Sequence, residues 1–182
     1  MPIPDSIPGP WSHHYSATAP KQTHVSIRGA LDSYEGWTRE TKHEVFHQGC
    51  YKNDTNLRQD SDVDVVVQLA ARLCPRVAGL SGLQLERNQA HKLAHDRWKS
   101  FRKQVLKALR AKYGTEAVTT GRKFLKLVKG KIPASADVVV TLQCGVGLAF
   151  YLLDEHRWVV SYPQQHHAKG QRIGQRLARL VR

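Results

Sequence analysis

The sequence is poor in cysteine and has no long apolar run. Its three cysteines, Cys50, Cys74 and Cys144, are odd in number and form no Cys-x-x-Cys pair, which argues against both a disulfide framework and a zinc ribbon. It contains no run of about 18 apolar residues, and its first residues lack the basic and apolar regions of a signal peptide. We therefore expect no membrane span and no export signal, and a reducing cytoplasm fits the cysteine usage.

Acidic residues are also scarce. The 182-residue chain has 28 Lys and Arg against 15 Asp and Glu, so its net charge is +13 and its pI is about 10.0. Between Arg97 and Lys131 the only acidic residue is Glu116. Such a basic surface predicts a polyanionic partner, and nucleoside triphosphates, RNA or another nucleic acid, and acidic surfaces all stay open. A solvated helix face explains the helical part of this stretch equally well.

Carboxylates stand at the start of two segments rich in valine. Asp62 and Asp64 precede Val65-Val66-Val67, and because side chains alternate along a strand, the two carboxylates point the same way, roughly 6.6 Å apart. Asp137 opens a second run of the same form, Val138-Val139-Val140. Carboxylate oxygens are the ligands that Mg²⁺ prefers, and Mn²⁺ is the alternative ion. The sequence predicts that Asp62, Asp64 and Asp137 bind metal.

A glycine turn precedes these carboxylates. Gly49 and Cys50 follow a predicted short strand, and residues 53–56 carry capping residues for a short following helix. Backbone N–H groups at such a turn and at a helix start bind phosphate oxygens. Gly49, Cys50 and Lys52 are therefore predicted nucleotide-binding residues, and Arg58 could add positive charge.

These features together predict nucleotidyl transfer, in which a hydroxyl attacks the α-phosphate of a nucleoside triphosphate and pyrophosphate leaves. Metals and positioning carry such chemistry, because it needs little covalent participation from the protein. Asp62 and Asp64 are expected to hold both ions, and Asp137 to hold the ion on the nucleophile side and to help remove the hydroxyl proton. The alternative is a polar turn before a buried strand, since a lone Asp-x-Asp pair is a weak motif.

Hydrophobic periodicity and turn residues predict the remaining elements. Helices are expected over 22–34, 85–113 and 173–181, and strands over 45–47, 62–69, 117–120, 124–128, 137–143, 150–153 and 158–161. Since helices and strands do not alternate strictly, the predicted fold class is α+β, with a mixed β-sheet and flanking helices. His91 and His95 stand four residues apart on the long helix, and without a further ligand they favour an ordinary helix surface over a metal site.

Segments 49–56 and 60–67 resemble the signature of the DNA polymerase β-type nucleotidyltransferases, most closely their bacterial cGAS/DncV-like branch (CD-NTases), which is related to oligoadenylate synthases. Further matches lie, in the family's order, at 3–6, 11–13, 98–102, 136–139, 162–163 and His166. The resemblance covers nearly the whole chain. It implies a polymerase β-like palm and an enzyme that joins nucleoside triphosphates such as ATP, commonly into cyclic oligonucleotide signals that trigger an antiphage effector.

The expected organisation is an irregular segment over 1–20, a catalytic core over 21–170 and a basic helix over 171–182 that starts a second lobe. Much of the family's second lobe is expected to be missing after His166. The family has Ser where this chain has Cys50, and a thiol is a weaker hydrogen-bond donor, so nucleotide affinity is open. The alternatives are a truncated or decaying member, a short minimal form, and a chain that takes its second lobe from a protein partner.

Two other functions stay open beside the synthesis of an oligonucleotide. One is a minimal transferase that attaches a nucleotide to a protein partner. The other is a degenerate, non-catalytic homologue that binds nucleotide or RNA through the basic surface between Arg97 and Lys131. Binding dominated by phosphate contacts would weaken steeply with salt, which distinguishes this last function.

Overall fold

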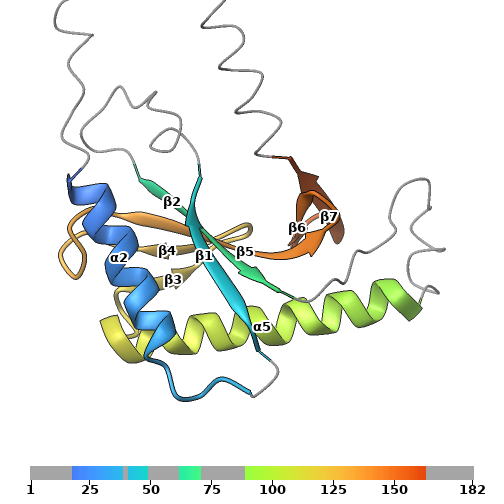
Figure 1. Cartoon of the computed structure of the whole chain (residues 1–182), viewed down its shortest axis with the longest axis horizontal. Coiled ribbons are helices and arrows are strands. Elements are labelled where there is room, and N and C mark those ends of the chain that lie inside the picture. The colour runs from blue at the N-terminus through green and yellow to red at the C-terminus, as the bar shows by residue number, and fades with distance from the viewer. Residues whose placement is uncertain (1–17, 39–40, 49–61, 71–88, 163–182) are drawn as a thin grey trace, which may run out of the picture.

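The structure is a computed structural model that describes residues 18–38, 41–48, 62–70 and 89–162 (Figure 1). In this part of the chain the strands form one sheet in the order β1-β2-β5-β4-β3, and β6 and β7 extend it from β5. β2 and β5 are parallel, whereas the other paired strands are antiparallel. The predicted α+β class with a mixed sheet and flanking helices is confirmed.

The elements follow the predicted order. The helices are α2 (Thr18–Asp32) and α5 (Gln89–Tyr113), and the strands are β1 (His43–His47), β2 (Val63–Leu69), β3 (Val118–Thr120), β4 (Leu125–Leu127), β5 (Ala136–Cys144), β6 (Gly147–Leu152) and β7 (Arg157–Ser161). Gly114 ends α5 with a φ of 92° and donates its N–H to the Arg110 carbonyl at 2.9 Å, as a glycine after a helix commonly does. The short helix expected after the capping residues 53–56, the helix expected over 173–181, and residues 1–17 lie outside the described residues. The irregular segment expected over 1–20 is too long, because α2 already begins at Thr18.

The alternation of side chains along β2 separates the two faces of the sheet. Val63, Val65 and Val67 are fully buried in one core cluster with residues of α2, α5 and β5. Trp98 of α5 anchors this packing, because its indole N–H donates to the Val140 carbonyl of β5 at 2.8 Å. Asp64 and the other alternate residues point to the opposite face, since neighbouring strand residues face opposite ways. The two described helices, α2 and α5, therefore lie on the face opposite the carboxylates.

The hairpin of β6 and β7 packs on α5 through an aromatic cluster. The rings of Tyr151 and Trp158 lie 5.4 Å apart, and each lies within 6.2 Å of the Trp98 ring. His95 packs at 4.4 Å from Tyr151, and His91 meets Trp158 edge to face. These two histidines are partly buried, so the prediction of an ordinary helix surface is wrong.

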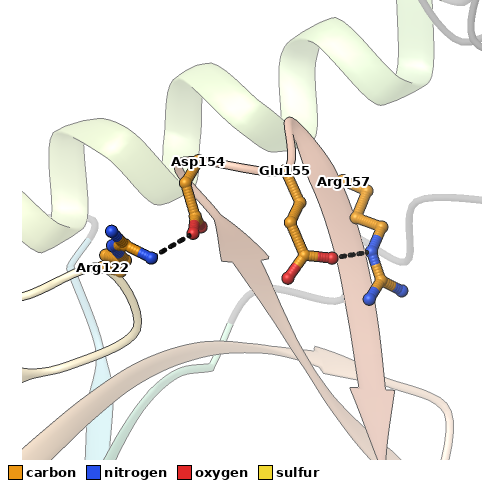
Figure 2. Close-up of polar contacts among 4 residues, drawn as sticks. All are labelled: Arg122, Asp154, Glu155 and Arg157. Atoms are coloured by element: carbon orange, nitrogen blue, oxygen red, sulfur yellow. Dashed lines mark hydrogen bonds and ion pairs between the residues drawn. The ribbon is translucent and has the colours of Figure 1, made fainter.

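Ion pairs surround the tip of the same hairpin. Figure 2 shows Arg122 reaching Asp154 and Arg157 reaching Glu155, at 3.3 and 2.5 Å. Arg122 comes from the turn between β3 and β4, so its contact joins two hairpins that are separate in the sequence. Such exposed pairs contribute about 0 to 1 kcal/mol each, and the aromatic packing is the stronger link.

The described residues include one cysteine, Cys144, and two helices that can be tested as membrane spans. Cys144 is disulfide-bonded, although the odd cysteine count argued against a disulfide framework, so the cysteines do not support a reducing compartment. Within the described ranges, no helix combines the length and the apolar character needed to cross a membrane.

Candidate active site

The three predicted carboxylates come together where β2 and β5 begin. In the parallel register of these strands Asp64 is paired with Asp137, and Val63 with Ala136. Asp62 precedes Asp64 by two residues and lies on the same face of the strand. A backbone hydrogen bond of 2.8 Å from Val63 N–H to the Ser135 carbonyl fixes this end of the register. The sheet thus gathers carboxylates that are 73 to 75 residues apart in the sequence.

Asp62 is held by two side chains from other strands or loops. The Lys126 ammonium of β4 donates to Asp62 Oδ2 at 2.8 Å, and the Ser135 hydroxyl donates to Oδ1. These two hydrogen bonds, with the positive charge of Lys126, hold the pKa of Asp62 below its usual value despite partial burial. Asp62 is therefore ionised, and each of its two oxygens accepts a hydrogen bond. The sequence analysis missed Lys126 and Ser135, since neither belongs to a motif.

Asp64 and Asp137 lie in a less favourable environment for a negative charge. Burial, and then the charge of Asp62, raises the pKa of Asp64. Burial and then the charge of Asp62 raise the pKa of Asp137 to about 6, with Lys126 opposing this rise and Asp64 adding to it. Asp137 Oδ1 is buried and has no hydrogen-bond partner among the described residues. The positive charge of Lys126 therefore offsets the cost of charging Asp137 only in part.

The three carboxylates are of the ligand type that suits a divalent cation. Within the described ranges, however, no three His, Cys, Asp or Glu side chains are arranged closely enough to bind one. Asp62 is paired with Lys126 and Ser135 instead. The unpartnered buried oxygen of Asp137 and the raised pKa of Asp64 are the features that a bound cation would relieve. Carboxylate oxygens on one face are ligands that Mg²⁺ or Mn²⁺ accepts. The residues fit such an ion, and their role as its ligands stays a prediction.

A cavity of about 460 Å³ lies beside Asp64 on the same face of the sheet. Its walls come from β2, β5, β6, β7 and the turn before β4: Gln48, Asp64, Val66, Lys123, Phe124, Val139, Thr141, Leu148, Phe150, Val159, Val160 and Ser161. Most of the wall is apolar, with a few polar residues among the lining. Small-molecule sites commonly have this size and composition.

The predicted phosphate-binding residues Gly49, Cys50 and Lys52, together with Arg58, lie outside the described residues. Gln48 is the last residue of the described segment before them. Its N–H donates to the Asp64 carbonyl at 3.0 Å, and its side chain lines the cavity. The chain therefore reaches position 49 from a residue directly beside Asp64.

Comparison with known proteins identifies relatives of one kind. The sequence is 40% identical to the cyclic UMP-AMP synthase of Rhodothermus marinus, over 93% of this chain and 61% of that protein. It is 28% identical to a cyclic nucleotide synthase of Staphylococcus haemolyticus, over 93% of this chain and 62% of that protein. No protein-family model matches the sequence.

The fold agrees with the sequence comparison. A structure of the R. marinus synthase with Apcpp and Upnpp has a TM-score of 0.73 and 37% sequence identity, and covers 96% of this chain and 62% of that one. The chain thus spans about three fifths of the length of these relatives. Sequence and fold agree over nearly all of its own length. The chain belongs to the cGAS/DncV-like nucleotidyltransferases, the CD-NTases, and has their polymerase β-like palm.

Proposed function

We propose that this chain is a metal-dependent nucleotidyltransferase that joins nucleoside triphosphates with release of pyrophosphate and makes a cyclic or linear oligonucleotide. The observation that carries the proposal is the in-register pair of Asp64 and Asp137 with Asp62 beside it. The similarity to a cyclic UMP-AMP synthase supports the product class. The cavity beside Asp64 offers space for part of a nucleotide.

Each carboxylate has a role that follows from its environment. Asp62 and Asp64 would hold two divalent ions, Mg²⁺ or Mn²⁺, and Asp137 would share the ion on the nucleophile side. When bound, the ions would neutralise triphosphate charge and make the attacking hydroxyl more acidic. As a ligand of the ion on the nucleophile side, Asp137 would also help to remove the hydroxyl proton.

The neighbouring segments complete the proposed site. Gly49, Cys50 and Lys52 would bind the triphosphate through backbone N–H groups and one ammonium. Residues 21–170 would form the catalytic core, and 171–182 would begin a second lobe. On the family resemblance, the product would be a second messenger of antiphage signalling, made from substrates that include ATP in the cytoplasm.

The test is product formation by the full 182-residue chain. The parent, Asp62→Asn, and the matched control Asp154→Asn on the exposed hairpin tip are incubated with labelled nucleoside triphosphates and Mg²⁺ or Mn²⁺. Phosphatase-resistant products are then separated, and nuclease digestion gives their linkage. We expect product from the parent and from Asp154→Asn, and a loss of at least about a hundredfold in Asp62→Asn, since that substitution removes a charge from the metal site.

Three results would contradict the proposal in different ways. Undiminished product in Asp62→Asn would remove Asp62 from the chemistry. Label on protein instead of a small product would indicate transfer to a protein partner. A folded parent chain that forms no product with either ion would show that this chain does not catalyse the reaction by itself.

A further inference from the structure

A lysine lies within the carboxylate site. Lys126 is the middle residue of β4 and pairs in the sheet with Asp137. Its neighbours Leu125 and Leu127 are buried in the core on the helix side of the sheet. Because side chains alternate along a strand, Lys126 points to the carboxylate face.

The reach of this side chain places its charge among the carboxylates. β5 lies between β4 and β2, yet the Lys126 ammonium reaches Asp62 at the start of β2 at 2.8 Å. It therefore extends across β5 from a backbone position directly beside Asp137. Lys126 stands in the same cross-strand row as Asp137 and Asp64, and its ammonium reaches Asp62, two residues before Asp64.

Both oxygens of Asp62 are engaged in this arrangement. Lys126 binds Oδ2 and the Ser135 hydroxyl binds Oδ1. A divalent cation that uses Asp62 as a ligand would have to share the carboxylate with the ammonium or replace it. An ammonium and a divalent cation bound to the same carboxylate would lie close together and repel each other strongly. The Lys126 side chain is 42% exposed, so it has room to move away.

We propose that Lys126 is the resident counter-ion of the carboxylate site and competes with a divalent cation for Asp62. The inference rests on the proposed metal site, and it adds a regulation of that site. Without metal, Lys126 offsets part of the repulsion among three carboxylates. When metal binds, the ammonium gives up Asp62. Lys126 is a positioning residue for Asp62, and it lowers the affinity of the empty site for the ion.

The test measures metal binding without nucleotide. Free Mn²⁺ is followed by electron paramagnetic resonance in a titration of the full chain, of Lys126→Met and of Lys126→Arg. Lys107→Met is the matched control, because Lys107 is exposed on α5 and changes the net charge by the same amount. We expect Lys126→Met to bind Mn²⁺ about tenfold more tightly than the parent, which is a change typical of one partly exposed charge. Lys126→Arg and Lys107→Met should bind as the parent does.

A second readout separates a metal effect from a general change in stability. Thermal unfolding of each variant is recorded in EDTA and in Mn²⁺. Lys126→Met should melt at a lower temperature than the parent in EDTA and should gain more from Mn²⁺, since binding to the folded state stabilises it. If Lys126→Met is unfolded in EDTA, recovery of the folded circular dichroism signal in Mn²⁺ supports the proposal, and no recovery overturns it.

The outcomes also distinguish this inference from the proposed function. Equal or weaker Mn²⁺ binding by Lys126→Met, with binding abolished by Asp64→Asn, would overturn the role of Lys126 and leave the metal site in place. An absence of Mn²⁺ binding in every variant would overturn the role of Lys126, and product formation by the parent would then decide the proposed function by itself. A gain in Lys126→Met that persists when Asp64→Asn is added would place the ion elsewhere and overturn the competition at this site.

Discussion

Asp64 on β2 and Asp137 on β5 are direct partners in the parallel register of the two central strands. Parallel partners have side chains on the same face, so the pairing brings two carboxylates together. Both have a raised pKa because they are partly buried and close to the charge of Asp62. The carboxylates repel one another when no cation is bound. Such repulsion is typical of a site that binds a cation, because the cation reduces it.

Asp137→Asn should stabilise the metal-free protein at neutral pH. The pKa of Asp137 is about 6 in the folded state against an ordinary value of 3.8. Between these values the folded state binds more protons than the unfolded state, so parental stability falls as pH rises from 4 to 6. At pH 7 the variant should be more stable by about 1 kcal/mol, a value reduced for partial exposure. Urea unfolding in EDTA at pH 4 to 7 measures this difference.

The same variant should be more stable than the parent but catalytically inactive. Asp137→Asn is expected to form no product under the conditions in which the parent does. Asp154→Asn, on the exposed hairpin tip, should change neither the pH dependence nor the product. An unchanged slope of stability between pH 4 and 6 in Asp137→Asn would contradict the raised pKa.

His47→Phe should make the protein more resistant to acid. The rings of His24 and His47 are stacked with centroids 4.0 Å apart, and burial, followed by repulsion from His24, lowers the pKa of His47 to about 4. The unfolded chain takes up this proton near pH 6.5 and the folded chain does not, so stability is lost as pH falls from 6.5 to 4. The variant keeps a ring and removes the titration.

We expect His47→Phe to lose about 1 to 2 kcal/mol less than the parent between pH 7 and 4.5. Thermal or urea unfolding at several pH values measures the loss. His156→Asn, in an exposed turn with a φ of 49°, is the matched control and should follow the parent. Equal acid sensitivity of His47→Phe and the parent would show that His47 titrates normally.

Trp98→Phe should destabilise the fold far more than Trp37→Phe. Trp98 is 1% exposed, and its N–H bond to the Val140 carbonyl is buried. The smaller ring leaves both a cavity and an unsatisfied carbonyl, which together cost about 2 to 4 kcal/mol. Trp37 donates to the Leu31 carbonyl at 2.7 Å in a partly buried position, so its replacement should cost about 1 kcal/mol. Chemical denaturation of both variants measures the two losses, and equal losses would argue against Trp98 as the anchor of α5.

Glycine to alanine substitutions should have opposite signs at two positions. Gly114 has a φ of 92°, which alanine adopts only with strain, so Gly114→Ala should cost about 1 to 2 kcal/mol. Gly29 lies inside α2, and a Cβ there would meet no atom within 4 Å among the described residues. Gly29→Ala should therefore stabilise the protein by about 0.5 to 1 kcal/mol. Melting temperatures of the two variants check the signs, and a stabilised Gly114→Ala would contradict this helix end.

Local patterns in the sequence were sufficient for the elements and for the two aspartate segments. The alternation around Val65 predicted a strand with carboxylates on one face, because side-chain direction in a strand depends only on its twofold period. Gly114 predicted the end of α5, since a left-handed residue after a helix favours glycine. The three carboxylates were found for the same reason, as each stands at the start of a valine-rich run.

The sequence pattern predicted the wrong environment for His91 and His95. Their spacing placed them on one face of a helix, and the absence of further ligands favoured solvent. In the structure that face meets Tyr151 and Trp158 from a hairpin about 60 residues later. The partner of a helix face depends on which strands the sheet places beneath it, and periodicity carries no information about that.

The sequence by itself determined which residues form the strands and which carboxylates share a face of each strand. Only the tertiary structure decided that β2 and β5 pair in the register that puts Asp64 beside Asp137, and that Lys126 extends across β5 to Asp62. The physical reason is the separation in sequence between the residues that interact. Strand formation follows from neighbouring residues, whereas register and strand order come from hydrogen bonds and core packing between segments more than 60 residues apart.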